Sequence, residues 1–182
     1  MNMELETKRL RLTEIGLNDL ENIHRFYSNP EVDEYNTQGI PADREETRER
    51  IDRIILDQIE ENRKSYTWKI IRKDTDEFIG IAGLNLSANR FKLGEIHYGL
   101  LPSHWGNGFA TEVAQLLIKT GFEHFNLHKV EAGVATENNR SIRVLEKSGM
   151  TREGLRRKIL PIRGEWKDNY HYAIVEDDPR NF

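Results

Sequence analysis

The sequence contains no cysteine, which excludes several kinds of site at once. Without thiols there is no disulfide framework, no thiolate metal site and no cysteine nucleophile, and nothing points to an oxidising compartment. There is also no run of about 18 apolar residues, and the N-terminal segment MNMELETKRLRL lacks the apolar core of a secretory signal. We therefore expect a soluble cytoplasmic protein.

A strong excess of charge of either sign is also missing. The 27 Lys and Arg residues against 31 Asp and Glu give a net charge of −4. Such a balance does not concentrate a protein on nucleic acid or on an anionic membrane, so neither partner is expected. The 182 residues, 37% of them hydrophobic, suffice for one folded core. We predict a single domain over residues 1–182, as a monomer or homodimer.

The spacing of apolar residues predicts a chain of mixed helices and strands. Three consecutive strand-like runs, 66–72, 78–86 and 93–101, predict an antiparallel meander. Two long strands at the end predict a hairpin that turns at Arg163-Gly164-Glu165. The other expected elements are a strand at 8–15, a short helix from Asn18 to about Pro30, a helix at 43–61, a helix at 109–125, a strand at 130–136 and a helix at 139–148.

A glycine-containing loop, WGNGFAT at Trp105–Thr111, connects the third meander strand to the next helix. Such a loop directs unpaired amides and the positive end of the helix dipole at one point, which suits a phosphate. A Walker loop requires a lysine that is absent here, and a dinucleotide fingerprint requires glycine in place of Thr111. Glu131 does lie where a ribose-binding acid would, but the preceding meander is not a βαβ unit. Taken alone, the loop is equally compatible with a simple turn.

Four collinear segments make the assignment more specific: TKRLRL, GEIHYGLLPSHWGNGFATE, TENNRSIRVLEKSGM and REGLRRKILPIRGEWKDNYHYAI. Together they span Thr7 to Ile174 and resemble the GNAT superfamily of N-acetyltransferases, most closely its ribosomal-protein branch of the RimJ and RimL type. The resemblance implies an acetyl-CoA-dependent N-acetyltransferase. It also implies an α/β (α+β) GNAT fold, with a mixed, strongly twisted central sheet of about seven strands flanked by about four helices.

The resemblance assigns the cofactor-binding residues. The family motif begins with Gln or Arg, and its replacement by Trp105 is typical of the Rim-like branch. The main chain near Leu100 and Leu101 is expected to pair with the pantetheine arm, which Asn138 would also hydrogen-bond. Arg143 is expected to approach the cofactor. The backbone amides expected to hold the diphosphate are those of Gly106, Asn107, Gly108, Phe109, Ala110 and Thr111.

Direct attack of the amine in a ternary complex is the expected route, because no cysteine can form an acyl-enzyme. Backbone N–H groups near Leu100 would polarise the thioester carbonyl. Many family members place a tyrosine acid where this chain has Leu145. The Rim-like branch instead suggests Ser141 as the acid, and the alternative for Ser141 is a hydroxyl that satisfies a helix N–H.

Glu153 is the favoured base, because it occupies the position of the base proposed for that branch. Its alternative is an exposed strand glutamate paired with Arg152 or Arg157, and Glu95 is the reserve candidate. Two histidines flank the end of the cofactor strand, His97 and His104, and a histidine has a convenient pKa for base work. His124 and His128 lack a third ligand, so no metal site is expected.

The acceptor amine is the least constrained part of the prediction. Tyr35, Asn85 and Asp168 are candidate substrate contacts, and Asn36 and Trp68 are further candidates for the wall of the site. Three hypotheses stay open: a protein or peptide amine such as an N-terminus, a small amine such as a polyamine, amino acid or antibiotic, and a non-catalytic acetyl-CoA-binding module. An open groove would favour the first, and a closed acidic pocket the second.

Overall fold

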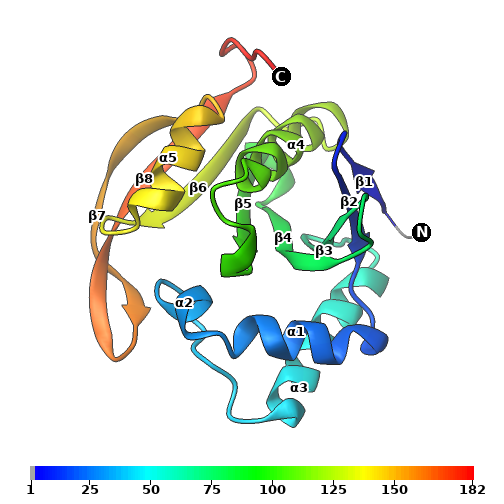
Figure 1. The fold of residues 1–182 in the computed structure, drawn as a ribbon. Coiled ribbons are helices and arrows are strands. Elements are labelled where there is room, and N and C mark those ends of the chain that lie inside the picture. Colours follow the sequence, from blue (N-terminus) through cyan, green and yellow to red (C-terminus); the bar gives the residue numbers. More distant parts are fainter. Residues whose placement is uncertain (1–2) are drawn as a thin grey trace.

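The computed structural model describes residues 3–182, so the first two residues of the predicted domain lie outside the described residues. One eight-stranded sheet runs in the order β1-β2-β3-β4-β5-β6-β8-β7 (Figure 1). Its strands are β1 (Leu5–Glu6), β2 (Leu10–Glu14), β3 (Ser65–Arg72), β4 (Phe78–Leu86), β5 (Leu93–Leu100), β6 (Lys129–Ala135), β7 (Thr151–Ile162) and β8 (Glu165–Val175). The α-helices are α1 (Leu20–Tyr27), α2 (Pro30–Asp33), α3 (Arg44–Ile59), α4 (Phe109–Glu123) and α5 (Asn139–Lys147).

The mixed fold, the meander and the final hairpin are confirmed, with two short elements added. The two-residue β1 pairs with β2 and makes the sheet eight-stranded rather than about seven-stranded. The single-turn α2 adds a fifth α-helix to the about four that were predicted. Asn29 starts it, because its Oδ1 accepts the Glu31 and Val32 amides at 2.9 and 3.3 Å, and Pro30 has the backbone angle that a first helical residue needs.

Helices cover the two faces of the sheet unequally. Alternate residues of β4 point to opposite faces, so Ala82 and Leu84 pack with α4, whereas Ile81 packs with α1 and α3. Helix α5 packs beside α4. Helices α1 and α3 cover one face of the sheet at β4. On the same face of β5, the side chains of Glu95 and His97 are exposed. Among residues 3–182, no helix is long and apolar enough to cross a membrane.

The two halves of the sheet separate between β5 and β6 (Figure 1). These strands are parallel because α4 connects them as a crossover. Their pairing covers only Leu93–Glu95 against Lys129–Glu131, after which the strands part. The glycine loop follows the free end of β5, and α5 follows the free end of β6. The predicted site residues therefore gather around this divergence.

Candidate active site

The glycine loop has the backbone shape that the phosphate hypothesis requires. Gly106 and Gly108 have φ angles of 76° and 79°, in the left-handed region that favours glycine, and Gly108 caps α4. The first amide to bond within α4 is that of Glu112, to the Gly108 carbonyl at 3.1 Å. The amides of the first three helical residues therefore point outward. A Cβ at Gly106 would meet nothing within 4 Å, so the loop has open space beside it, where a phosphate group could approach the backbone amides.

A polar network ties this loop to the start of β2. The Arg9 guanidinium donates to the Asn107 carbonyl at 3.0 Å and forms an ion pair with Glu112 at 2.6 Å. Glu112 also accepts the Thr7 hydroxyl. Burial acts to raise the pKa of Glu112, but the hydrogen bonds from Thr7 and Arg9 outweigh it and lower the pKa. The TKRLRL segment thus has a physical role, which is to fix the loop and the first turn of α4.

We expect Glu112→Gln to lower stability by about 1–3 kcal/mol and to weaken acetyl-CoA binding, because it weakens bonds to a charged group that hold the loop. The stabilisation arises above the ordinary glutamate pKa and disappears as pH falls through the lowered value, so the deficit should shrink in acid. Melting curves with and without acetyl-CoA measure both effects. Glu123→Gln is the control, because that exposed carboxylate on α4 pairs with Lys119 alone among residues 3–182, at 3.9 Å. An unchanged melting temperature would contradict the anchoring role.

The free end of β5 directs a backbone amide toward the divergence. The Leu101 amide donates to the Ile79 carbonyl on the β4 side, and the Leu101 carbonyl accepts from His104. Amides alternate in direction along a strand, so that of Leu100 points away from β4, toward the side of β6. The Trp105 indole fixes this turn by donating to the Leu100 carbonyl at 2.8 Å. Both main-chain groups of Leu101 already have partners. Of the two residues expected to contact the pantetheine arm, Leu100 is therefore the more suitable.

The start of α5 places Asn138 and Ser141 on the opposite side of the divergence. Asn138 caps the helix, its Oδ1 accepting the Ser141 amide at 3.2 Å, so the Ser141 hydroxyl is not needed as a cap. That hydroxyl instead lies 3.1 Å from the Tyr98 hydroxyl of β5. Leu145, where many relatives place the acid, is buried in the core. Arg143 is exposed on α5, where its expected approach to the cofactor stays a prediction.

His97, one of the two flanking histidines, does not have the convenient pKa that the sequence suggested for base work. The His97 ring lies over Gly83, close enough that a Cβ there would be only 2.2 Å away. Although part of the ring is accessible, the surrounding protein desolvates it and lowers the pKa of His97 to about 4. His104 is buried beneath the loop, with Nε2 3.4 Å from Glu77. His97 therefore stays neutral at pH 7 and is a weak proton acceptor.

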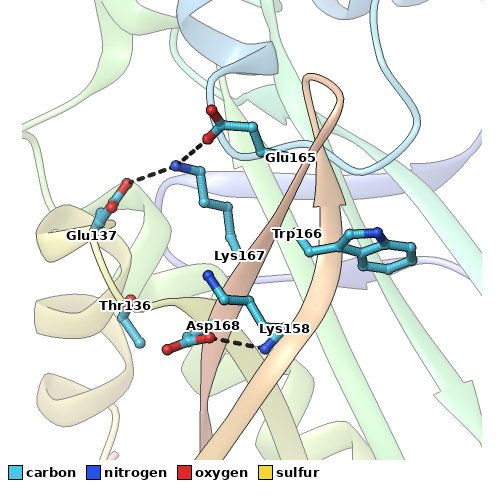
Figure 2. Close-up of a pocket in the computed structure, with 7 residues that line it drawn as sticks. All are labelled: Thr136, Glu137, Lys158, Glu165, Trp166, Lys167 and Asp168. Carbon is cyan, nitrogen blue, oxygen red and sulfur yellow. Dashed lines mark hydrogen bonds and ion pairs between the residues drawn. The ribbon is translucent and has the colours of Figure 1, made fainter.

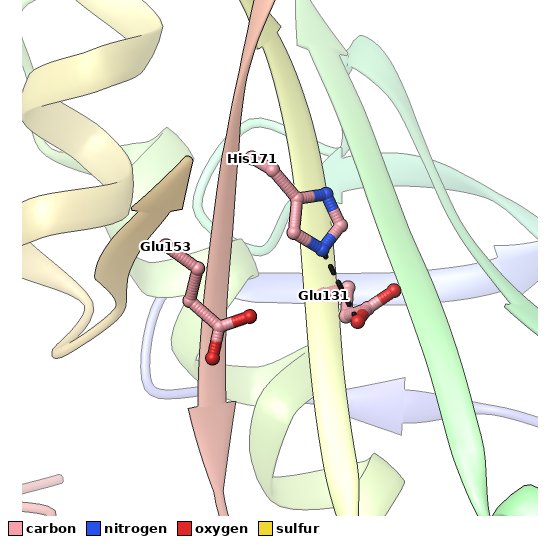
Figure 3. Close-up of side chains that lie close together, drawn as sticks. All are labelled: Glu131, Glu153 and His171. Carbon is pink, nitrogen blue, oxygen red and sulfur yellow. Dashed lines mark ion pairs between the residues drawn. The ribbon is translucent and has the colours of Figure 1, made fainter. Parts of the chain in front are cut away.

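Glu153 lies in a charged cluster on the open face of β6, β8 and β7. Figure 3 shows three members of this cluster, Glu131, Glu153 and His171. The fourth member is Lys129. Lys129 Nζ is 2.6 Å from Glu153 and 3.7 Å from Glu131, and Glu131 is 3.1 Å from His171 Nε2. Glu153 is therefore paired with Lys129, rather than with the neighbouring arginines considered from the sequence. Glu131, Glu153 and His171 are close enough to share an ion, but the Lys129 ammonium already supplies positive charge to both carboxylates.

Glu95 has a different environment from Glu153. It is the last β5 residue paired with β6, and its partner in the register is Glu131. Its side chain is exposed, and no cationic side chain within residues 3–182 lies within 4 Å of its carboxylate. The reserve base candidate is thus located where the strands part.

An open pocket of about 780 Å³, which we call the hairpin pocket, lies between the β7–β8 hairpin and the turn before α5 (Figure 2). Asp168 accepts the Lys158 amide at 2.8 Å, and Lys167 lies 2.7 Å from Glu165 and 4.0 Å from Glu137. The lining residues are Thr136, Glu137, Lys158, Glu165, Trp166, Lys167 and Asp168. Most of these residues could not be predicted as pocket residues, because the sequence pattern of a hairpin is the same whether its charged residues line a pocket or only face water.

Other candidate acceptor contacts are dispersed. Tyr35 donates to the Glu137 carbonyl at 3.2 Å and so lies beside the hairpin pocket with Asp168. Asn85 is exposed on β4, where it meets Ser65. Asn36 accepts the Gln38 amide in its own turn. The suggestion that Trp68 lines the site is wrong, because the side chain is fully buried in the core and its indole bonds to the Met3 carbonyl.

Comparisons with known proteins agree with this geometry. A family model described as an acetyltransferase (GNAT) domain matches residues 9–151. The uncharacterised N-acetyltransferase p20 of Bacillus licheniformis is 34% identical over 172 residues, covering 94% of this chain and 96% of that protein. A solved GNAT-family acetyltransferase of Bacillus anthracis is 30% identical, with a TM-score of 0.83 over 97% of this chain and 100% of that one.

More distant structures share the fold. The ribosomal-protein-S5-alanine acetyltransferase of Vibrio fischeri has a TM-score of 0.84 at 20% identity, covering 97% of this chain and 98% of that chain. The spermidine N-acetyltransferase of Vibrio cholerae, solved with CoA and spermine, has a TM-score of 0.81 at 22% identity, covering 94% and 98%. Because the family model spans most of the sequence and a full-length relative exceeds 30% identity, this chain belongs to the GNAT family of acetyltransferases.

Proposed function

We propose that this enzyme transfers an acetyl group from acetyl-CoA to the amino terminus of a protein or peptide, by direct attack in a ternary complex. The observation that carries the proposal is the glycine loop at the start of α4, beside strands that part after Glu95. Outward-facing amides at Phe109, Ala110 and Thr111 suit the diphosphate. The Leu100 amide suits the thioester carbonyl, whose oxygen gains negative charge during attack.

For the proton acceptor, the structure favours Glu95 over Glu153. Glu95 lies at the divergence without a cationic partner among the described residues, whereas Glu153 is held by Lys129 at 2.6 Å. A base must reach the amine directly or through one water, and an exposed carboxylate beside the diverging strands meets that requirement. Glu153 then has the supporting role of holding Lys129 on the open face.

We expect Glu95→Gln to lower kcat/KM about 100-fold, the smaller end of the usual range for a general base. Glu153→Gln should have a smaller effect, because it removes an ion pair rather than the proton acceptor. Steady-state rates of both variants on one verified acceptor decide between them. The reverse ranking would restore Glu153 as the base, and two unchanged variants would leave water as the acceptor.

The hairpin pocket supports a polypeptide acceptor. It is open, its charges are of both signs, and the Trp166 side chain beside it is 59% exposed. A polyamine site should be closed and acidic, whereas this pocket is open and mixes the ammonium groups of Lys158 and Lys167 with its carboxylates. An extended chain with a free terminus can instead meet acidic and basic side chains in turn. The Vibrio fischeri structure, which is named for ribosomal-protein acetylation, shows that this fold occurs in an enzyme with a polypeptide acceptor.

A CoA-release assay across N-terminal peptides, polyamines and aminoglycosides tests the proposal. The absence of cysteine from the chain gives a thiol reagent no protein background. Turnover with peptides alone supports the proposal, and turnover with polyamines or aminoglycosides alone replaces it with small-amine acetylation. If no amine releases CoA although calorimetry shows that acetyl-CoA binds, the chain is a binding module rather than a catalyst.

A further inference from the structure

A hydrogen bond joins the two halves of the sheet beyond the point where they part. The Tyr98 hydroxyl and Ser141 Oγ are 3.1 Å apart. Tyr98 lies on β5 past Glu95, the last residue paired with β6, and Ser141 lies in the first turn of α5, which follows β6. The two hydroxyls therefore meet across the space where the acyl donor is proposed to bind.

The surrounding structure holds both hydroxyls in place. The Asn138 side chain caps α5 through the Ser141 amide, which leaves the serine hydroxyl available. One residue earlier on α5, the Arg140 guanidinium lies 4.0 Å from the centre of the Trp105 ring and makes a second contact across the divergence. Burial raises the pKa of Tyr98, with the bond to Ser141 opposing the rise, so the phenol keeps its proton at neutral pH.

We propose that Tyr98 is a positioning residue for acetyl transfer, donating a hydrogen bond to Ser141 Oγ so that the serine hydrogen is directed at the departing sulfur. This inference rests on the proposed reaction and on Ser141 as its acid. A serine hydroxyl has one hydrogen and two lone pairs, so it can accept from Tyr98 and donate to sulfur at the same time.

The proton balance closes without another reactant. The amine nitrogen forms the new bond to the acetyl carbon, and the carbon–sulfur bond breaks with its electron pair on sulfur. Ser141 gives its proton to that sulfur, while the hydrogen bond from Tyr98 stabilises the charge growing on the serine oxygen. Glu95, the proposed base, accepts the proton that the amine loses, and this proton then returns to Ser141 through water. Tyr98 keeps its own proton throughout.

Binding of CoA and of desulfo-CoA tests the arrangement without any acceptor. Calorimetry should show the wild type binding CoA about 2- to 10-fold more tightly than desulfo-CoA, the net effect of one hydrogen bond to sulfur. Tyr98→Phe should bring this ratio toward one while both ligands still bind. A ratio that Tyr98→Phe leaves unchanged would overturn the proposal. Because this experiment needs no amine, it decides about Tyr98 even if the proposed acceptor fails.

Kinetics then separate positioning from a purely structural role. Tyr98→Phe should lower kcat about tenfold without changing the KM for acetyl-CoA, and should add nothing to a Ser141→Ala background. Tyr172→Phe is the matched control, because the Tyr172 hydroxyl also links a strand to α5. It donates a hydrogen bond to the Glu146 carboxylate at 3.1 Å. The control should keep its kcat and its ligand ratio. Losses from Tyr98→Phe and Ser141→Ala that simply multiply would refute action through the serine.

Discussion

Replacing Gly108 with aspartate is expected to abolish the rise in melting temperature that acetyl-CoA gives the wild-type protein. A ligand at 100 times its Kd stabilises the native state by about 2.7 kcal/mol, so the wild-type shift should be large. Gly108 has a φ of 79° at the cap of α4, where any side chain is strained. An aspartate there also places a negative charge where the diphosphate is expected. Thermal melts over a range of acetyl-CoA concentrations provide the measurement.

Two controls separate strain from charge in this experiment. Gly39→Asp introduces the same residue at a similar φ of 74°, in the loop between α2 and α3, and should keep the full acetyl-CoA shift. Gly108→Asn keeps the size and the backbone strain of aspartate without its charge, so it should retain part of the shift. If Gly108→Asp responds to acetyl-CoA as the wild type does, the diphosphate does not bind at this loop.

Ser141→Ala is expected to lower kcat about 100-fold while leaving the Kd for CoA within a few fold. Loss of a general acid costs about 100- to 10,000-fold, and solvent can replace part of its function. The helix should be unaffected, because Asn138 caps it through the Ser141 main chain, which alanine keeps. Single-turnover rates with a verified acceptor, together with calorimetry of CoA binding, measure the two quantities separately.

Ser148 supplies the matched control at the other end of α5. Its hydroxyl is buried and donates to the Val144 carbonyl at 2.8 Å, so Ser148→Ala should cost stability but not kcat. A Ser141→Ala variant with full kcat would show that the hydroxyl only bridges to Tyr98. The departing thiolate would then take its proton from water.

The sequence was sufficient to predict the helices, strands and loops that are determined by residues close together in the chain. The apolar spacing of α3, the glycines before α4 and the strand-like runs of β3 to β5 each determine structure within a few residues, and all of these elements are confirmed. The single turn α2 was missed, because one turn carries too few residues for a periodic pattern. The loop that contains Gly106 and Gly108 was predicted from these two glycines, and both adopt the left-handed backbone conformation that favours glycine.

The contacts that depend on the order of strands in the sheet could not be predicted from the sequence. Glu153 meets Lys129 because β8 lies between β6 and β7, and the small Ala173 of β8 pairs with Glu131 on one side and Thr151 on the other. Nothing in the spacing of residues specifies that order. The Tyr98–Ser141 bond likewise depends on how far β5 and β6 diverge, and the low pKa of His97 depends on the protein packed around its ring.

This sheet has a short pairing near its centre as well as at its β1 edge. Three register pairs join β5 to β6, whereas seven join β4 to β5. An acyl donor that lies between the diverging strands, with its thioester carbonyl at the Leu100 amide, would act as a temporary strand and fill the gap in the sheet. The rigidity of the molecule would then follow the supply of its own acyl donor, stiffening when acetyl-CoA is plentiful and loosening when it is scarce.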